Sequence, residues 1–140
     1  ELLHAASKYG TGILPYYPLA SGFLTGKYKR GMAPPEGSRL ARLQWTADQH
    51  ATDAGFDLLE SLERFASDRR HSMVELAFAW LLAHPEVSSV IAGATRVEQI
   101  VQNAAAAEWE LTREDMAELD QILPGTPGPG TGNLPRRRTL

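Results

Sequence analysis

The chain has 140 residues, about the length of one domain, and can bury a sizeable apolar core. Its formal net charge of −3 argues against a nucleic-acid binder, and the absence of cysteine excludes disulfides and thiol chemistry. No apolar run approaches the roughly 18–20 residues of a membrane span, and the first residues do not resemble a signal peptide. A soluble, cytoplasmic protein is therefore expected, with neither membrane nor nucleic acid among its partners.

The sequence opens without Met on residues 1–10, which have the pattern of the body and end of a helix closed by Gly10. We therefore expect the chain to be cut from something longer. A short strand is predicted over 11–17, where Pro15 indicates a strand end or edge. The following segment, 18–28, contains two glycines, a serine, a threonine and a lysine. Such a segment is either a ligand-binding loop that presents backbone N–H groups or a plain surface loop.

A long polar loop is predicted from 29 to 44, the most basic segment of the folded body. Loops of that length are usually functional or disordered. A helix with an apolar stripe should follow from about 47 to 69. The next helix should begin at Ser72, which with Glu75 has capping-box spacing. That helix is apolar almost all round, so deep packing is expected, and His84-Pro85 ends it.

A β-branched run at 87–91 predicts a second buried strand, and the small-residue turn 92–94 follows it. Thr95 and Glu98 have the spacing of a capping box, so a helix should start there. The free N–H groups and the dipole of such a helix N-terminus favour a phosphate. The alternative is an ordinary strand–helix unit that binds nothing.

A last helix is predicted over 113–123, capped by Thr112 and Asp115. The remaining residues, 124–140, are rich in proline and glycine and end in three arginines. They predict an extended, flexible tail, whose arginines either touch a phosphate or a partner or are simply solvated.

Strands that alternate with helices indicate a parallel α/β arrangement. Two strands cannot make a stable sheet covered on both faces, and a complete (β/α)8 barrel needs roughly 250 residues. The predicted fold is therefore α/β: the C-terminal part of a (β/α)8 TIM barrel, about the last two βα units plus a C-terminal helix, incomplete as given. The phosphate site of that fold often uses the loops after strands 7 and 8, and the two loops singled out here follow the two predicted strands.

Several motifs, in order, resemble the aldo-keto reductases. ILPYYPLASGFLTGKY at 13–28 resembles their strand-7 segment, and PEGSR at 35–39 follows it as in the family. LAFAWLL at 76–82 resembles their seventh barrel helix, and IAGATRVEQIVQN at 91–103 resembles their adenosine-phosphate motif. The last predicted helix resembles their C-terminal helix. The match covers about residues 1–123 and is nearest to the bacterial branch related to potassium-channel beta subunits.

The resemblance implies an NADPH-dependent oxidoreductase that reduces aldehydes or ketones to alcohols, with no metal. Tyr16 would stack its flat ring on the nicotinamide. The first loop and Arg39 would lie along the ribose and pyrophosphate, and the second loop would hold the 2′-phosphate and adenine. The expected cofactor-binding residues are Tyr16, Pro18, Leu19, Ser21, Gly22, Leu24, Gly26, Lys27, Arg39, Gly93, Ala94, Thr95, Arg96, Gln99 and Asn103.

The second loop departs from the family pattern. Many members carry basic side chains where this chain has Gly93 and Gln99, and an acid where Gln102 stands. Arg96 is the nearby cation that remains for a 2′-phosphate. NADP(H) is the expected cofactor, with NAD as the alternative.

The catalytic tetrad of the family, an Asp, a Tyr, a Lys and a His, lies in the first half of the barrel and has no match here. Hydride transfer needs a proton donor of tuned pKa beside the carbonyl. The expected function is thus the NADP(H)-binding portion of an aldo-keto reductase, inactive alone. The alternative is a non-catalytic cofactor-binding or oligomerising half-barrel, in which copies of the chain cover the open sheet edges.

Overall fold

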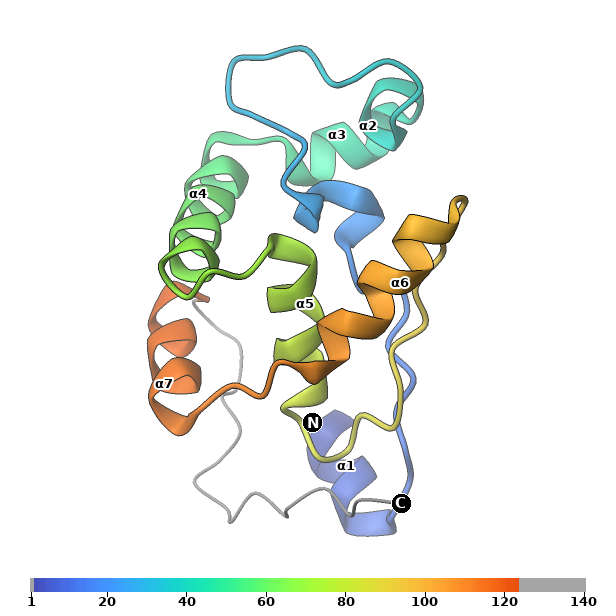
Figure 1. The fold of residues 1–140 in the computed structure, drawn as a ribbon, viewed down its shortest axis with the longest axis vertical. Helices are drawn as coiled ribbons and strands as arrows, with labels where there is room; N and C mark the ends of the chain where they lie inside the picture. Colours follow the sequence, from blue (N-terminus) through green and yellow to red (C-terminus); the bar gives the residue numbers. More distant parts are fainter. Residues whose placement is uncertain (1, 124–140) are drawn as a thin grey trace.

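The computed structural model describes residues 2–123, which are mostly helical (Figure 1). The predicted tail, 124–140, lies outside the described residues. Within residues 2–123, no helix combines the length and apolar content needed to cross a bilayer. In chain order the elements are α1 (Leu2–Tyr9), the 3₁₀ segment η1 (Ala20–Thr25), α2 (Arg39–Arg42), α3 (Gln44–His50), α4 (Asp53–Asp68), α5 (Met73–Leu82), α6 (Val97–Ala105), the 3₁₀ segment η2 (Ala106–Glu108) and α7 (Arg113–Ile122).

The two predicted strands meet in a single parallel bridge between Ile13 and Val87. The Ile13 N–H donates to the Glu86 carbonyl at 2.7 Å, and the Ser88 N–H donates to the Ile13 carbonyl at 3.0 Å. Within residues 2–123 the prediction of regular strands over 11–17 and 87–91 is wrong, because each segment has one neighbour and Pro15 has no N–H to extend the ladder. The parallel direction is the one that a βα arrangement requires.

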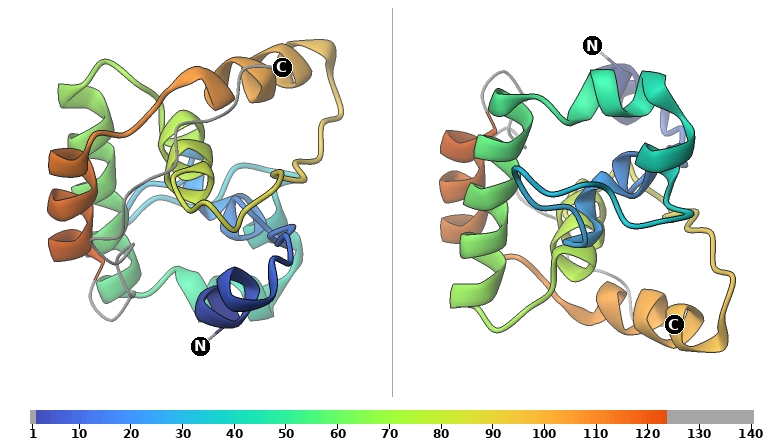
Figure 2. Two further views of the ribbon diagram at one scale, coloured as in Figure 1. Left: turned by 90° about the horizontal axis from the view of Figure 1, so that it is seen from below. Right: turned by 90° about the horizontal axis from the view of Figure 1, so that it is seen from above.

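The helices form layers around α5. Figure 2 shows α4 and α7 side by side at one edge, with α5 near the centre and α1 and α6 on opposite sides of it. The core lies where α4, α5 and α7 meet: Leu59 and Leu119 are each 1% exposed, and Leu76 is 3% exposed. Burying such a side chain contributes about 1.5–3 kcal/mol. Phe23 of η1 belongs to the same cluster, so the core fixes the position of the loop after Ile13.

Two of the three predicted capping boxes are confirmed, at the starts of α5 and α7. The Ser72 N–H donates to the Glu75 carboxylate at 2.7 Å, and the Glu75 N–H donates to the Ser72 hydroxyl at 3.3 Å. Thr112 and Asp115 make the same pair of bonds at 2.9 and 3.1 Å. The helix predicted at 1–10 is also confirmed, as α1.

The single helix predicted from 47 to 69 is wrong. The chain forms α3 and α4 instead, with a break at Ala51, whose φ and ψ of −84° and 49° are not helical. Thr52 has extended backbone, and its hydroxyl accepts from the Gly55 N–H at 3.0 Å. Threonine favours the N-cap over a helix interior because its hydroxyl satisfies a free N–H there. The apolar stripe of α4 is nevertheless buried, as predicted.

The segment predicted as a long loop, 29–44, contains α2 and the first residue of α3, so this prediction is wrong at its C-terminal end. Ser38 caps α2 by accepting from the Ala41 N–H at 3.4 Å. The preceding part of the segment is tied to α4 by ion pairs. Lys29 contacts Glu63 at 2.7 Å, and the guanidinium of Arg30 contacts Asp53, Asp57 and Glu60 at 3.2, 2.5 and 3.0 Å.

Candidate functional site

Two loops follow the residues of the parallel bridge and lie at the same edge of the molecule. The chain runs in the same direction through Ile13 and Val87 and then enters the first loop, 16–28, and the second loop, 92–96 (Figure 1). Ligands of parallel α/β folds bind at the carboxyl edge of the strands. The edge that carries both loops is therefore the candidate site.

The first loop is tightly folded and partly strained. Ala20 and Ser21 have φ values of 46° and 58°, in the left-handed region that L-residues seldom adopt, and Gly22 has a φ of 93°. The N–H groups of Ala20, Gly22 and Leu24 donate to carbonyls within the loop. Ser21, a predicted binding residue, is 5% exposed. These three N–H groups are therefore committed to shaping the loop, which leaves its side chains to meet a ligand.

Lys27 lies over the turn at Gly22. A Cβ atom added to Gly22 would come within 3.4 Å of the Lys27 Nζ, so glycine leaves room for the ammonium group. The same Nζ stands 5.1 Å from the centroid of the Tyr28 ring, a cation–π contact. The Thr25 hydroxyl donates to the Gly22 carbonyl at 2.7 Å and holds the turn closed. The arrangement presents one exposed cation at the centre of the loop.

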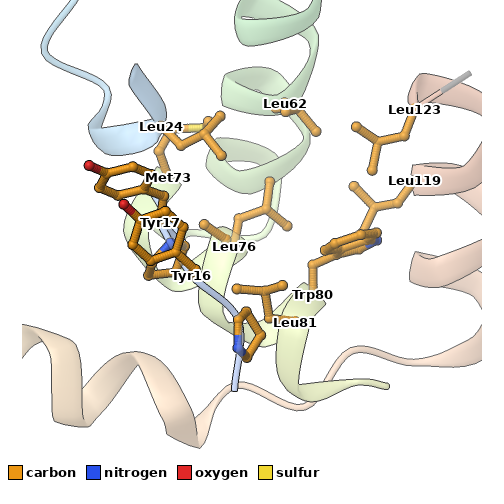
Figure 3. Close-up of a pocket in the computed structure, with 13 residues that line it drawn as sticks. Tyr16, Tyr17, Leu24, Leu62, Met73, Leu76, Trp80, Leu81, Leu119 and Leu123 are labelled. Carbon is orange, nitrogen blue, oxygen red and sulfur yellow. The ribbon is translucent and has the colours of Figure 1, made fainter. Parts of the chain in front are cut away.

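Tyr16 presents an exposed aromatic ring at the start of this loop, with 81% of the residue accessible. Its ring packs on that of Tyr17, with centroids 4.0 Å apart and planes at 36° (Figure 3). The Arg39 guanidinium lies 5.6 Å from the centroid of the Tyr17 ring. The pKa of Tyr16 is raised, first because its side chain hydrogen-bonds with that of Tyr17; the positive charge of Arg39 opposes this.

An apolar cavity of about 210 Å³ lies behind the tyrosine pair (Figure 3). Tyr16, Tyr17, Pro18 and Leu24 line it from the first loop, and Pro15 lines it from the residue just before that loop. The rest of the lining comes from α4, α5 and α7 and includes Leu62, Met73, Leu76, Trp80 and Leu119. No charged side chain lines it, so it suits apolar groups. Sequence reasoning missed both the cavity and Tyr17, whose pairing with the neighbouring tyrosine is the one signal that was present.

The start of the second loop's helix differs from the prediction. Arg96, not Thr95, is the N-cap of α6, and it makes no side-chain cap bond. The Gln99 side-chain oxygen accepts from both the N–H and the hydroxyl of Thr95, at 2.8 and 3.2 Å. The predicted capping box of Thr95 with Glu98 is therefore wrong, because Gln99 reaches back to the N–H that precedes the helix.

The second loop is open to solvent. Gly93, Ala94, Thr95 and Arg96 are all exposed, and a Cβ atom at Gly93 would meet nothing within 4 Å. Open space around the turn and the start of α6 leaves room for a ligand to approach the backbone. Of the remaining predicted residues, Pro18, Leu19, Leu24, Gly26, Gln99 and Asn103 are half-buried, and Lys27 and Arg39 are exposed.

One histidine, His50, stacks on Phe23 of the first loop with ring centroids 5.7 Å apart, and a second, His84, is buried. His84 is 3% exposed and follows the C-cap of α5, Ala83. Burial lowers its pKa, although Glu86 and Asp120 act in the opposite sense. Residues 2–123 contain no cluster of three His, Asp or Glu side chains that could hold a metal. The candidate site therefore offers cations and an aromatic face, which suit a phosphorylated, flat ligand.

Comparison with known proteins gives one family. The chain matches the model of the Aldo/keto reductase family over residues 1–124. It is 40% identical over 133 residues to a putative voltage-gated potassium channel subunit beta of Schizosaccharomyces pombe, covering 91% of this chain and 38% of the relative. It is 36% identical over 127 residues to L-glyceraldehyde 3-phosphate reductase of Escherichia coli O157:H7, covering 87% and 36%.

Among solved structures, a glycerol dehydrogenase of Gluconobacter oxydans superposes with a TM-score of 0.69 at 26% identity, covering 86% of this chain and 36% of that one. The chain thus spans less than two fifths of the length of these three proteins.

Proposed function

The chain belongs to the aldo/keto reductase family of oxidoreductases, and from this premise we propose that it is the NADP(H)-binding portion of an enzyme that reduces aldehydes or ketones to alcohols. The observation that carries the proposal is the parallel contact of Ile13 with Val87. Because of it, a loop with an exposed aromatic ring and a cation lies at the same edge as an open helix N-terminus.

The first loop suits the nicotinamide half of the cofactor. The exposed Tyr16 ring offers a flat apolar face to the nicotinamide. Lys27, held over the Gly22 turn, is the group for the pyrophosphate, since a charge-assisted contact of an ammonium with phosphate is about twice as strong as a neutral hydrogen bond. Pro18, Leu19, Ser21, Leu24 and Gly26 build the loop around these two groups, and Arg39 lies beside it.

The second loop suits the adenosine half. The N-terminus of α6 favours an anion through its N–H groups and dipole. Arg96 and Thr95 lie at that end, and Gln99 is fixed there by its bonds to Thr95. Gly93 and Ala94 leave the approach open, and Asn103 is the polar residue further along the helix. The preference for NADP(H) over NAD rests on Arg96.

When bound, the nicotinamide would supply the hydride for carbonyl reduction. The residues of this chain would bind and orient it, with the Tyr16 ring against one face. The raised pKa of Tyr16, which follows first from its hydrogen bond with Tyr17, makes its hydroxyl a poorer acid. Since no part of the sequence matches the tetrad motifs of the family, we place the proton donor and the rest of the catalytic tetrad outside this chain.

We assign residues 1–123 to the C-terminal segment of a TIM barrel and residues 124–140 to a separate tail. Large apolar side chains that are exposed in the structure support this assignment. Leu14 and Ile91 flank the bridge and are 57% and 63% exposed, and α6 exposes Val97, Ile100 and Val101 by 71%, 59% and 63%. The remainder of a barrel would cover them. The alternative function, an oligomerising half-barrel, rests on the same surface covered by another copy.

Fluorescence titration with NADPH tests the proposal. The full-length protein should bind NADPH, and Tyr16→Ala should weaken binding by about three- to tenfold, the worth of an aromatic stack. The 140-residue chain, assayed alone with NADPH and a generic aldehyde, should show no turnover. Full-length protein that binds no nicotinamide cofactor contradicts the proposal. Turnover by the chain that survives both Tyr16→Ala and removal of contaminating reductases would place the chemistry within this chain.

A further inference from the structure

Tyr17 has a backbone conformation that a bulky residue adopts only under constraint. Its φ is 57°, in the left-handed region, where Gly, Asn and Asp are the usual occupants. Non-glycine residues stay there when their surroundings hold them, and such residues cluster at ligand sites. The question is therefore what holds the Tyr17 side chain and what that side chain supports.

Three contacts hold the Tyr17 ring. Tyr16 packs on it with ring centroids 4.0 Å apart. The Arg39 guanidinium lies 5.6 Å from its centroid. Part of its surface lines the apolar cavity that extends to α5 and α7 (Figure 3), and 43% of the residue stays exposed to solvent. Aromatic pairs and cation–π contacts are both directional, so Tyr16, Tyr17 and Arg39 form a ladder of planar groups.

Arg39 is itself fixed in position. It is the first residue of α2, which Ser38 caps through its hydroxyl. The next residue, Leu40, is 4% exposed and packs in the core. The Arg39 carbonyl accepts from the Leu43 N–H at 2.8 Å. The ladder therefore connects the exposed Tyr16 ring, through Tyr17, to a helix anchored in the core.

We propose that Tyr17 and Arg39 are positioning residues, which hold the Tyr16 ring at the orientation in which it accepts a flat nicotinamide on its exposed face. The inference rests on the proposed function and extends it to two residues that act through Tyr16. Tyr17 packs against Tyr16 at an angle of 36° between the ring planes, and the Tyr16 ring stays widely open to a ligand, with 81% of the residue accessible. Arg39 thus belongs to the tyrosine ladder in this proposal, whereas the family resemblance implies that Arg39 contacts the pyrophosphate.

Two ligands separate these roles of Arg39. NADPH and 2′-phospho-ADP-ribose share the adenosine, the 2′-phosphate, the pyrophosphate and the second ribose, and only NADPH carries the nicotinamide. A residue that acts through Tyr16 affects NADPH alone. A residue that contacts the pyrophosphate affects both ligands equally. Dissociation constants for both, measured on full-length protein by isothermal titration calorimetry, therefore report the route by which each side chain acts.

Tyr17→Ala should weaken NADPH by about three- to tenfold, and Arg39→Gln by about two- to fivefold, as expected for losing one ring pair or one exposed cation–π contact. Binding of 2′-phospho-ADP-ribose should change less than about twofold, within the error of such comparisons. Tyr17→Phe keeps the ring and should bind NADPH as the wild type does. Arg42→Gln, which removes an exposed arginine from the same short helix, is the matched control and should alter neither ligand.

A double-mutant cycle tests whether Tyr17 acts through Tyr16. In a Tyr16→Ala background, Tyr17→Ala should cause no further loss of NADPH affinity. Equal losses of both ligands in Arg39→Gln would overturn the ladder in favour of a phosphate contact. Additive losses from the two tyrosines would overturn it as well. If circular dichroism shows that Tyr17→Ala is unfolded, the affinities for NADPH and 2′-phospho-ADP-ribose are compared in Tyr17→Leu and Arg39→Gln instead. Wild-type protein that binds neither ligand would instead defeat the proposed function.

Discussion

In the function proposed above, the choice between NADPH and NADH depends on Arg96. Arg96 is exposed, it has extended backbone at φ −141° and ψ 152°, and it is the N-cap residue of α6. A cation at a helix N-terminus is slightly unfavourable for the helix dipole. An anionic ligand bound there, as proposed above, would offset that cost. A charge-assisted contact with a 2′-phosphate is worth about 1.5–3 kcal/mol.

Arg96→Ala should therefore weaken NADPH binding by about ten- to a hundredfold and leave NADH binding nearly unchanged. Fluorescence titration of both cofactors against wild type and variant measures the difference. Arg113→Ala, which removes an exposed arginine from the first turn of α7, is the matched control and should change neither. Equal losses of NADPH and NADH, or none for either, would remove Arg96 from the site.

His84 makes the stability of the protein depend on pH. Burial lowers its pKa, and the two carboxylates that act on it, Glu86 and Asp120, only partly offset this. The unfolded chain therefore binds a proton on this histidine at a higher pH than the folded chain does. Between the lowered pKa of the folded state and the ordinary histidine pKa of about 6.5, the free energy of unfolding therefore rises with pH. As pH falls below about 6.5, proton uptake by His84 in the unfolded chain lowers the free energy of unfolding.

His84→Leu should remove part of the difference in free energy of unfolding between pH 7.5 and pH 5.5, measured by urea titration. His4→Leu, which changes an exposed histidine of α1, should leave the difference intact. A wild-type protein equally stable at both pH values would show that His84 takes up its proton without cost in the folded state.

At the scale of elements, helix starts are where single side chains contribute most. Ser72 caps α5, the most buried helix, and shares a complete capping box with Glu75. Thr95 has the same spacing from Glu98 and does not cap α6. Ser72→Ala should lower the free energy of unfolding by about 1 kcal/mol. Thr95→Ala, tested without cofactor, should cost a few tenths of that. Urea unfolding midpoints of the two variants measure these changes in the free energy of unfolding. Equal changes in the two variants would contradict the assigned caps.

Sequence reasoning succeeded where the determinant is local. Ser72 and Thr112 cap helices with partners three residues away, and the apolar stripe of α4 follows from helical spacing alone. It failed at Thr95, because Gln99 competes for the same N–H from the next turn. It failed at Thr52, where a hydroxyl overrode a continuous helical pattern.

Sequence reasoning also failed at the left-handed backbone of Tyr17, because a bulky aromatic residue gives no local signal for a positive φ. The cavity behind the tyrosines arises from three helices that converge from distant parts of the chain, so no local pattern predicts it.

At the scale of the whole molecule, exposed apolar surface governs association. The α6 face formed by Val97, Ile100 and Val101 has no cover among the described residues. Contiguous patches of this kind mark interfaces or aggregation sites. The 140-residue chain, purified alone, should form dimers or larger assemblies by multi-angle light scattering, or melt at low temperature. Ile100→Lys should raise the monomer fraction, and Gln102→Lys, an exposed polar position, should not. A well-folded, high-melting wild-type monomer at dilute concentration would contradict this prediction.

The ion pairs of Lys29 and Arg30 with α4 have a consequence for how the segment between η1 and α2 is protected. Tyr28, 2% exposed, anchors the start of this segment in the core, and the surface ion pairs of Lys29 and Arg30 hold the residues that follow it. The screening length falls from about 10 Å at 0.1 M salt to about 3 Å at 1 M. Raising the ionic strength should therefore release the residues around Lys29 and Arg30 at salt concentrations that leave the core folded. Trypsin, which cleaves after lysine and arginine, would then find Lys29 and Arg30 at high salt while helices α4, α5 and α7 stay intact. The first loop is thus held to the core at Phe23 and Tyr28, whereas the chain that follows it is held to α4 by ion pairs that salt weakens.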